Sequence, residues 1–210
     1  MTVTVIVTGF GPFPGAPFNP TGPLAKRLAR MRRPTLANVK VVSHVFPTSY
    51  TAVDRELPTL IAEHKPDALL MFGLAPRARA LRIEIRARNA VTLLPDSTGR
   101  APQRGAIALD APPTFAIPAP LRALLAATRD ARMPATPSRD AGNYLCNYLC
   151  WRVCEITRKS KGPRLAAFIH VPPVRRGARP RGLAKARPSL DDLIRAGSFL
   201  LAASAAAARR

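Results

Sequence analysis

The sequence predicts an α/β domain with a largely parallel or mixed sheet. Short apolar runs rich in β-branched residues alternate with longer amphipathic patterns, which is typical of a chain whose strands and helices alternate. The 210 residues are 47% hydrophobic, which is enough for one sizeable core. No internal repeat and no convincing linker divides the sequence, so we expect a single domain over residues 1–210.

The first part of the chain contains two expected strand and helix pairs. Residues 3–8 form an apolar, β-branched run and predict the first strand. Residues 20–33 predict a helix with Asn19 as its N-cap, because apolar residues recur on one helical face. A second strand is expected over residues 39–45, and a helix over about 51–64.

The middle of the chain continues the alternation with one long interruption. Residues 67–73 predict a buried strand that ends in glycine, and residues 80–87 alternate apolar and charged side chains as a half-exposed strand does. Residues 91–118 are rich in turn-forming residues and predict a loop region. Helices are expected over about 119–132 and 144–159.

One strand and one helix complete the predicted fold. Residues 165–169 form an apolar strand that runs directly into His170. The last helix is expected to begin after Ser189, whose hydroxyl can cap it. Asp191 and Asp192 then lie in the first turn, where negative charge is favourable.

The charge of the chain is strongly positive, and its arginines are scattered along the sequence, most densely at 175–181. The sequence has 33 Lys and Arg residues against 12 Asp and Glu residues, a formal net charge of +21. Such a charge is typical of proteins that bind nucleic acid or an anionic surface. Here the arginines are scattered, and aromatic residues are not interleaved with them as a stacking platform for bases requires. We therefore expect no specific nucleic-acid site.

The expected location is cytoplasmic. The N-terminal residues lack the pattern of a signal peptide, and no apolar run approaches the roughly 20 residues that span a bilayer, so no membrane partner is expected. The odd number of cysteines suits a reducing compartment. Cys146, Cys150 and Cys154 are spaced by four residues, which places them along one face of a helix rather than around a metal. We expect no metal and no cofactor.

Two residues have the chemistry and the local setting of a nucleophile and its base. Cys146 follows a glycine turn that opens a helix, and the positive end of that helix favours a thiolate. His170 lies at the end of a strand and is followed by a rigid Val-Pro-Pro segment. His44 and His64 have settings that suggest structural roles, and Cys150 and Cys154 read as small core residues. Taken alone, Cys146 and His170 would be interpreted in the same structural way.

The surrounding motifs change that interpretation, because together they resemble the pyroglutamyl-peptidase I (pyrrolidone-carboxylate peptidase) family of cysteine peptidases. The resemblance covers nearly the whole chain. Its strongest segments are AGNYLCN at 141–147 and FIHVP at 168–172. Further matching segments occur in the same order as in the family, at 8–13, 19–21, 73–75, 84–89, 95–102 and 188–190.

The resemblance implies a catalytic triad and a substrate pocket. Cys146 would be the nucleophile, His170 its base, and Glu84 the residue that orients the histidine. The enzyme would remove pyroglutamate from the N-terminus of small peptides through an acyl-enzyme. The residues expected to bind the substrate are Phe10, Phe13, Leu74, Tyr144 and Leu145.

The resemblance also sharpens the expected fold and assembly. It implies a single-domain three-layer α/β/α sandwich with a mixed central sheet, of the phosphorylase/hydrolase-like type. A homo-oligomer, by resemblance a tetramer, is expected. A charge of +21 on every subunit would oppose close assembly unless the charges point outward.

The sequence departs from the family pattern at several positions near the expected pocket. Leu74 stands where a glutamine is usual, Leu93 where an arginine is usual, and 76–78 reads Pro-Arg-Ala in place of Gly-Gly-Arg. Arg139 and Asp140 add charge just before the nucleophile. We expect these changes to remodel the pocket walls and alter specificity or activity. The alternative is a weakly active relative whose basic surface binds polyanions such as nucleic acid.

Overall fold

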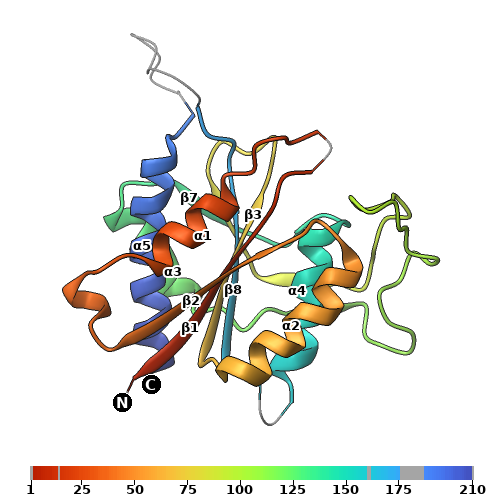
Figure 1. Cartoon of the computed structure of the whole chain (residues 1–210), viewed down its shortest axis with the longest axis horizontal. Helices are drawn as coiled ribbons and strands as arrows, with labels where there is room; N and C mark the ends of the chain where they lie inside the picture. Colours follow the sequence, from red (N-terminus) through yellow and green to blue (C-terminus); the bar gives the residue numbers. More distant parts are fainter. Residues whose placement is uncertain (1, 14, 160–161, 176–186, 210) are drawn as a thin grey trace.

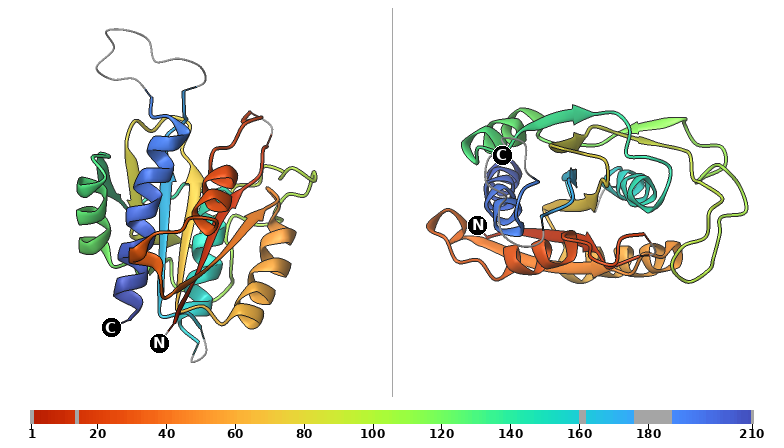
Figure 2. Two further views of the ribbon diagram at one scale, coloured as in Figure 1. Left: turned by 60° about the vertical axis from the view of Figure 1, so that its left-hand side comes forward. Right: turned by 90° about the horizontal axis from the view of Figure 1, so that it is seen from above.

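The computed structural model describes residues 2–13, 15–159, 162–175 and 187–209. They form a three-layer α/β/α sandwich (Figures 1 and 2). The strands are β1 Val3–Phe10, β2 Val39–Phe46, β3 Ala68–Leu74, β4 Leu81–Glu84, β5 Arg86–Arg88, β6 Thr114–Ala116, β7 Ala135–Ser138 and β8 Leu165–Val171. The helices are α1 Thr21–Ala29, α2 Tyr50–His64, α3 Leu121–Asp130, α4 Leu145–Thr157 and α5 Leu190–Ala208, with a short 3₁₀ turn at Pro34–Leu36.

The central sheet has six strands in the order β2-β1-β3-β8-β4-β7. The first four are parallel, whereas β4 runs antiparallel to β8 and parallel to β7, so the sheet is mixed. The register places His170 of β8 beside Gly73 of β3 on one side and Arg82 of β4 on the other. Strands β5 and β6 form a separate antiparallel pair.

Two hydrophobic cores cover the two faces of the sheet, because successive strand residues point to opposite sides. Helices α1, α3 and α5 pack on one face, around residues such as Val5 and Leu70. Helices α2 and α4 pack on the other face, around Ile6, Leu69 and the fully buried Trp151. Figure 1 shows α1 and α5 on one side of the sheet and α2 and α4 on the other, with both chain ends at the same edge.

The predicted α/β fold is confirmed, and the main errors concern the middle of the chain. The single strand expected over 80–87 is two strands in two sheets, because the chain leaves the central sheet at Ile85. The short strand β7 was not predicted. Within the predicted loop region 91–118, residues 114–116 form β6.

The helix boundaries follow the local capping chemistry. Helix α1 is shorter than predicted, and Pro20 rather than Asn19 occupies its N-cap position. The Asn19 side chain instead accepts a hydrogen bond from the Thr21 amide at 3.1 Å. The predicted cap of α5 is confirmed. The Ser189 hydroxyl accepts a hydrogen bond from the Asp192 amide at 3.1 Å, and the Asp192 carboxylate accepts one from the Ser189 amide at 2.9 Å. No helix among the described residues has the length and apolar character that crossing a bilayer requires.

Candidate active site

A cavity of about 400 Å³ lies at the carboxyl ends of β1, β3 and β8, where open α/β sheets bind their ligands. It brings Cys146 and His170 together with all five residues expected to bind the substrate. Its lining consists of Phe10, Phe13, Asn19, Thr48, Leu74, Ala75, Pro76, Arg82, Asp140, Ala141, Gly142, Asn143, Tyr144, Leu145, Cys146 and His170.

A buried carboxylate supports the histidine of this cavity. His170 Nδ1 lies 2.8 Å from Oε1 of Glu84, which has no exposed surface. Since an ionised carboxylate only accepts, Nδ1 is the donor, and this contact fixes the orientation of the ring. The other carboxylate oxygen, Oε2, has no hydrogen-bond partner among the described residues. The three residues expected to act together therefore meet at one place, with Glu84 behind the histidine.

The electrostatics of the site favour a protonated histidine. Burial alone would lower the pKa of His170, but its hydrogen bond and charge interaction with Cys146, together with those of Glu84, raise that pKa to about 9. The imidazole is thus largely an imidazolium near neutral pH. A positive ring beside the sulfur is the arrangement that stabilises a thiolate.

The position of Cys146 follows from the turn before α4. Gly142 has a φ of +83°, a left-handed conformation that glycine adopts without strain, and the chain then enters α4 at Leu145. Cys146 lies in the first turn of the helix, which has no side-chain cap, and its side chain is half-buried. Unpaired amides and the helix dipole at this end both favour negative charge.

The two remaining cysteines are core residues, as the sequence predicts. Cys150 and Cys154 are fully buried in the core under α4. Burial raises the pKa of Cys154 to about 11 and that of Cys150 well above its ordinary range. Both are therefore neutral thiols at physiological pH.

Gly73 makes room for the sulfur, a role that sequence reasoning missed. A Cβ atom at this position would lie 2.9 Å from the Cys146 sulfur and 2.6 Å from Cζ of Phe168. Real Cβ atoms essentially never approach heavy atoms so closely. A glycine that ends a buried strand beside the expected site was the available signal.

One loop, residues 95–100, supports the wall of the cavity at Tyr144. The buried carboxylate of Asp96 accepts from the amides of Tyr50 and Thr98 at 2.9 and 2.8 Å, which ties residues 95–100 to the start of α2. Burial opposes the charge, but the hydrogen bonds from Thr98, Tyr50 and Ser49 lower the pKa of Asp96. The Tyr144 hydroxyl donates to the carbonyl of Pro95 at 3.1 Å, so the same loop positions this side chain.

Of the departures from the family pattern, only some reach the cavity. Leu74 and Pro76 line it, as does Asp140. The expectation that Leu93 alters the pocket wall is wrong, because Leu93 does not line the cavity and is 58% exposed on the loop after β5. Arg77 is likewise absent from the lining. The remodelling is therefore confined to the β3–β4 turn and the segment before α4.

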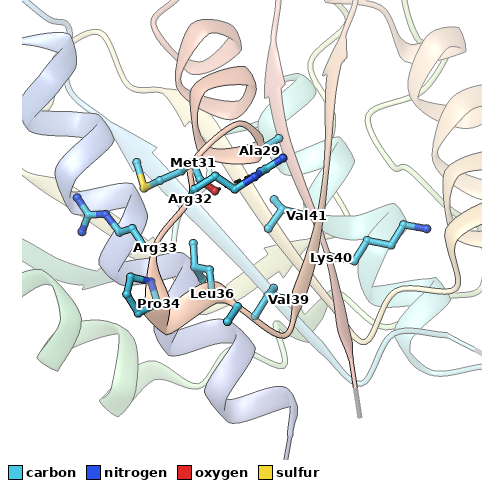
Figure 3. Close-up of a pocket in the computed structure, with 10 residues that line it drawn as sticks. Ala29, Met31, Arg32, Arg33, Pro34, Leu36, Val39, Lys40 and Val41 are labelled. Atoms are coloured by element: carbon cyan, nitrogen blue, oxygen red, sulfur yellow. Dashed lines mark hydrogen bonds between the residues drawn. The ribbon is translucent and has the colours of Figure 1, made fainter.

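Other candidate groups lie away from this site. His44 pairs with Glu56 at 2.9 Å, between β2 and α2. A separate hollow of about 650 Å³ lies beside the 3₁₀ turn and the start of β2, at the opposite end of the strands (Figure 3). The residues that line it include the cations Arg32, Arg33 and Lys40 but no cysteine, histidine or carboxylate. Across the described part of the chain, no three His, Cys, Asp or Glu side chains group to hold a metal ion.

Comparison with known proteins agrees with this geometry. The pyroglutamyl peptidase family matches residues 3–206. The pyrrolidone-carboxylate peptidase of Thermococcus litoralis is 36% identical over 169 residues, which cover 80% of this chain and 76% of that protein. The enzyme of the same name from Thermococcus onnurineus is 31% identical over 203 residues, covering 95% and 98%.

Solved structures give the same result. The pyrrolidone carboxyl peptidase from Thermococcus litoralis superposes with a TM-score of 0.85 at 32% identity, covering 97% of this chain and 93% of that one. A mutant pyrrolidone carboxyl peptidase from Pyrococcus furiosus superposes with a TM-score of 0.84 at 27% identity, covering 96% and 98%. This chain therefore belongs to the pyroglutamyl peptidase family.

Proposed function

We propose that this protein is a cysteine peptidase that removes pyroglutamate from the N-terminus of small peptides, with Cys146 as nucleophile, His170 as general base and acid, and Glu84 as the residue that orients His170. The observation that carries the proposal is the contact of His170, whose pKa is raised, with a cysteine in the first turn of a helix and, behind the cavity wall, with a buried carboxylate. The names of the relatives supply the substrate class.

The reaction follows from the protonation states at the site. The Cys146 thiolate attacks the carbonyl carbon that joins pyroglutamate to the next residue, and a tetrahedral intermediate forms. The C–N bond then breaks, and the imidazolium of His170 gives its proton to the leaving amine. His170 next takes a proton from water, whose oxygen attacks the thioester, and pyroglutamate and the free thiolate are released.

The first turn of α4 supplies the charge stabilisation that this reaction needs. The negative oxygen of the tetrahedral intermediate develops next to the attacked carbon, and the backbone amide of Cys146 is the nearest natural donor. Amides at a helix start have no intrahelical acceptor, so they are available without rearrangement. Losing one donor of this kind typically costs on the order of 100-fold or more in rate.

The cavity walls suit a small lactam. Phe10, Phe13 and Leu145 provide apolar surface, and Tyr144 closes one side with its hydroxyl already bonded to Pro95. A five-membered ring with one amide fits such a box by shape and a few hydrogen bonds. Leu74 contributes no polar group, so backbone donors and acceptors would recognise the lactam there.

The alternative function, polyanion binding, receives no support from the cations near the site. Arg82, Arg86 and Arg88 are bonded to carbonyl oxygens of residues 139–142 rather than arranged around an open surface. These arginines therefore have a local role, which accounts for part of the unusual positive charge.

Hydrolysis of a pyroglutamyl-aminocoumarin substrate tests the proposal. We expect turnover by the parent protein, loss of turnover in Cys146→Ser, and near-parent turnover in Cys154→Ser. The last variant is a matched control, because the Cys154 thiol already donates to the carbonyl of Ala116 and a serine can do the same. Absence of turnover in the parent, or equal rates in the parent and Cys146→Ser, would contradict the proposal.

A further inference from the structure

Arg82 contacts both the Glu84 carboxylate and the segment that precedes α4. It lies on β4 two residues before Glu84, so both side chains point to the same face of the strand. It is also the direct cross-strand neighbour of His170 in the sheet. Its side chain is 39% exposed and lines the same cavity as Cys146.

One contact of Arg82 is with the catalytic carboxylate. Arg82 Nε lies 3.6 Å from Oε1 of Glu84, the oxygen that also meets His170. Besides His170, Arg82 is the only cation paired with Glu84 in the described part of the chain. Because the carboxylate is fully buried and its second oxygen has no partner there, a nearby positive charge offsets the cost of burying it.

The other contacts of Arg82 are with the segment that leads to the nucleophile. Arg82 Nη2 donates to the Ser138 hydroxyl at 2.7 Å and to the carbonyl of Asp140 at 2.9 Å. The Ser138 hydroxyl accepts in turn from the Asp140 amide at 3.3 Å. The chain enters α4 five residues after Asp140, and Cys146 is the second residue of that helix.

Two further arginines extend this contact along the same segment. Arg86 donates twice to the carbonyl of Arg139, at 3.2 and 3.1 Å, and Arg88 donates to the carbonyl of Gly142 at 3.0 Å. In the described part of the chain, neither arginine forms a hydrogen bond or ion pair with Glu84 or His170, so both hold the segment before α4 without contacting that pair.

We propose that Arg82 is a positioning residue that couples the Glu84–His170 pair to the segment that leads into α4, the helix of the Cys146 nucleophile. This inference rests on the proposed catalytic roles of those three residues. The guanidinium of Arg82 places a positive charge near the Glu84 carboxylate and the His170 imidazole. Its hydrogen bonds to Ser138 and Asp140 hold the segment before α4, and so keep the Cys146 sulfur within reach of the imidazole. Misplacement of reacting groups by about 1 Å can cost on the order of 100-fold in rate.

Removal of the charge has a defined effect on pH dependence. The charged and titratable groups around His170 are Arg82 and Glu84 from β4, Cys146 and the buried Cys150 from α4, and the exposed Asp140 before it. A positive charge opposes the binding of protons by the groups around it, and its removal favours their protonated forms. Both the acid and the alkaline limb of the plot of rate against pH should therefore move to higher pH, by on the order of half a pH unit for a nearby charge whose side chain is partly exposed.

The test uses kcat, KM and the rate of Cys146 alkylation by iodoacetamide, each as a function of pH. In Arg82→Gln we expect kcat to fall by about 10- to 100-fold with little change in KM, and both limbs to move upward. The glutamine can still donate to Ser138, which favours folding, and a thermal melt checks it. Arg82→Lys should restore the position of the limbs. Arg86→Gln should lower kcat but leave the pH profile in place. Arg122→Gln removes the same charge from an exposed position on α3, and it should change neither kcat nor the pH profile.

The alternative outcomes are distinguishable. The proposal would be overturned if the pH profile of Arg82→Gln coincided with that of the parent. It would also be overturned if the profile of Arg82→Lys moved as far as that of Arg82→Gln. The pH dependence of alkylation reports on the Cys146–His170 pair in the absence of substrate. It therefore tests the role of Arg82 even if the protein does not hydrolyse the pyroglutamyl substrate. Ordinary reactivity of Cys146 in the parent would overturn both this proposal and the proposed function.

Discussion

Replacing Gly73 by alanine should impair catalysis more than it impairs folding. The new Cβ atom would lie 2.9 Å from the Cys146 sulfur and 2.6 and 2.8 Å from two atoms of the Phe168 ring. To reach 3.4 Å, the lower end of ordinary contact, the ring must withdraw by about 0.8 Å and the sulfur by about 0.5 Å. Phe168 is fully buried and stands edge-on to His170, with ring centroids 5.0 Å apart, so its movement also disturbs the imidazole.

These displacements set the expected magnitudes. Overpacking of this kind typically costs about 1–3 kcal/mol of unfolding free energy, which lowers Tm by several degrees in a chain of this length. A shift of the sulfur and imidazole by a large fraction of 1 Å should lower kcat by on the order of 100-fold. Hydrolysis of a pyroglutamyl-aminocoumarin substrate and a thermal melt measure the two effects.

A matched control and a compensating change make the experiment decisive. Gly105→Ala introduces the same methyl group where nothing lies within 4 Å of the Cβ position, so both kcat and Tm should stay at the parent values. Adding Phe168→Leu to Gly73→Ala should recover part of the lost stability, because the ring is the nearest obstacle. Parent-like kcat in Gly73→Ala would refute the steric argument and, with it, the assigned position of the sulfur.

Three further outcomes follow from the site and from α5. Since the pKa of His170 is raised to about 9, the imidazolium is present below that pH and lost above it, and kcat/KM should fall as pH rises through about 9. Glu84→Gln removes one of the groups that raise this pKa, so the alkaline limb should move to lower pH and kcat should fall by on the order of 100-fold or more; an unmoved limb would count against the role of Glu84. Ser189→Ala removes the α5 cap and should cost about 1 kcal/mol of unfolding free energy, read as a lower Tm with unchanged kcat; a loss of kcat would show that α5 communicates with the site.

The sequence was sufficient for the residues whose chemistry depends on their neighbours along the chain. The glycine turn before Cys146 and the strand that runs into His170 are local patterns, and both identify reactive positions at the ends of buried elements. The contact of His170 with Glu84 spans 86 positions and depends on β4 running antiparallel to β8. Only the resemblance to a family joined these residues before the structure did.

The errors have physical causes that a single sequence does not reveal. Strand β7 is short and contains Pro137, which an edge strand tolerates but which weakens any strand pattern. The break at Ile85 separates two sheets, although the alternation of apolar and charged residues continues through it. That alternation did place Arg82 on the same face as Glu84. Its significance depended on Ser138 and Asp140, more than 50 positions away.

The register between β4 and β8 places the proposed catalytic residues in two separate parts of the fold. Glu84 and His170 lie on adjacent strands joined by backbone hydrogen bonds, so they move together, whereas the Cys146 sulfur belongs to α4, which contacts the strands through side chains. Different parts of one structure open locally at different free energies. We expect heating to separate the sulfur from the imidazole while the sheet is still intact, so that inactivation precedes the main unfolding transition. Substitutions on the buried face of α4, such as at Trp151, should widen the interval between the temperature of inactivation and the temperature of unfolding.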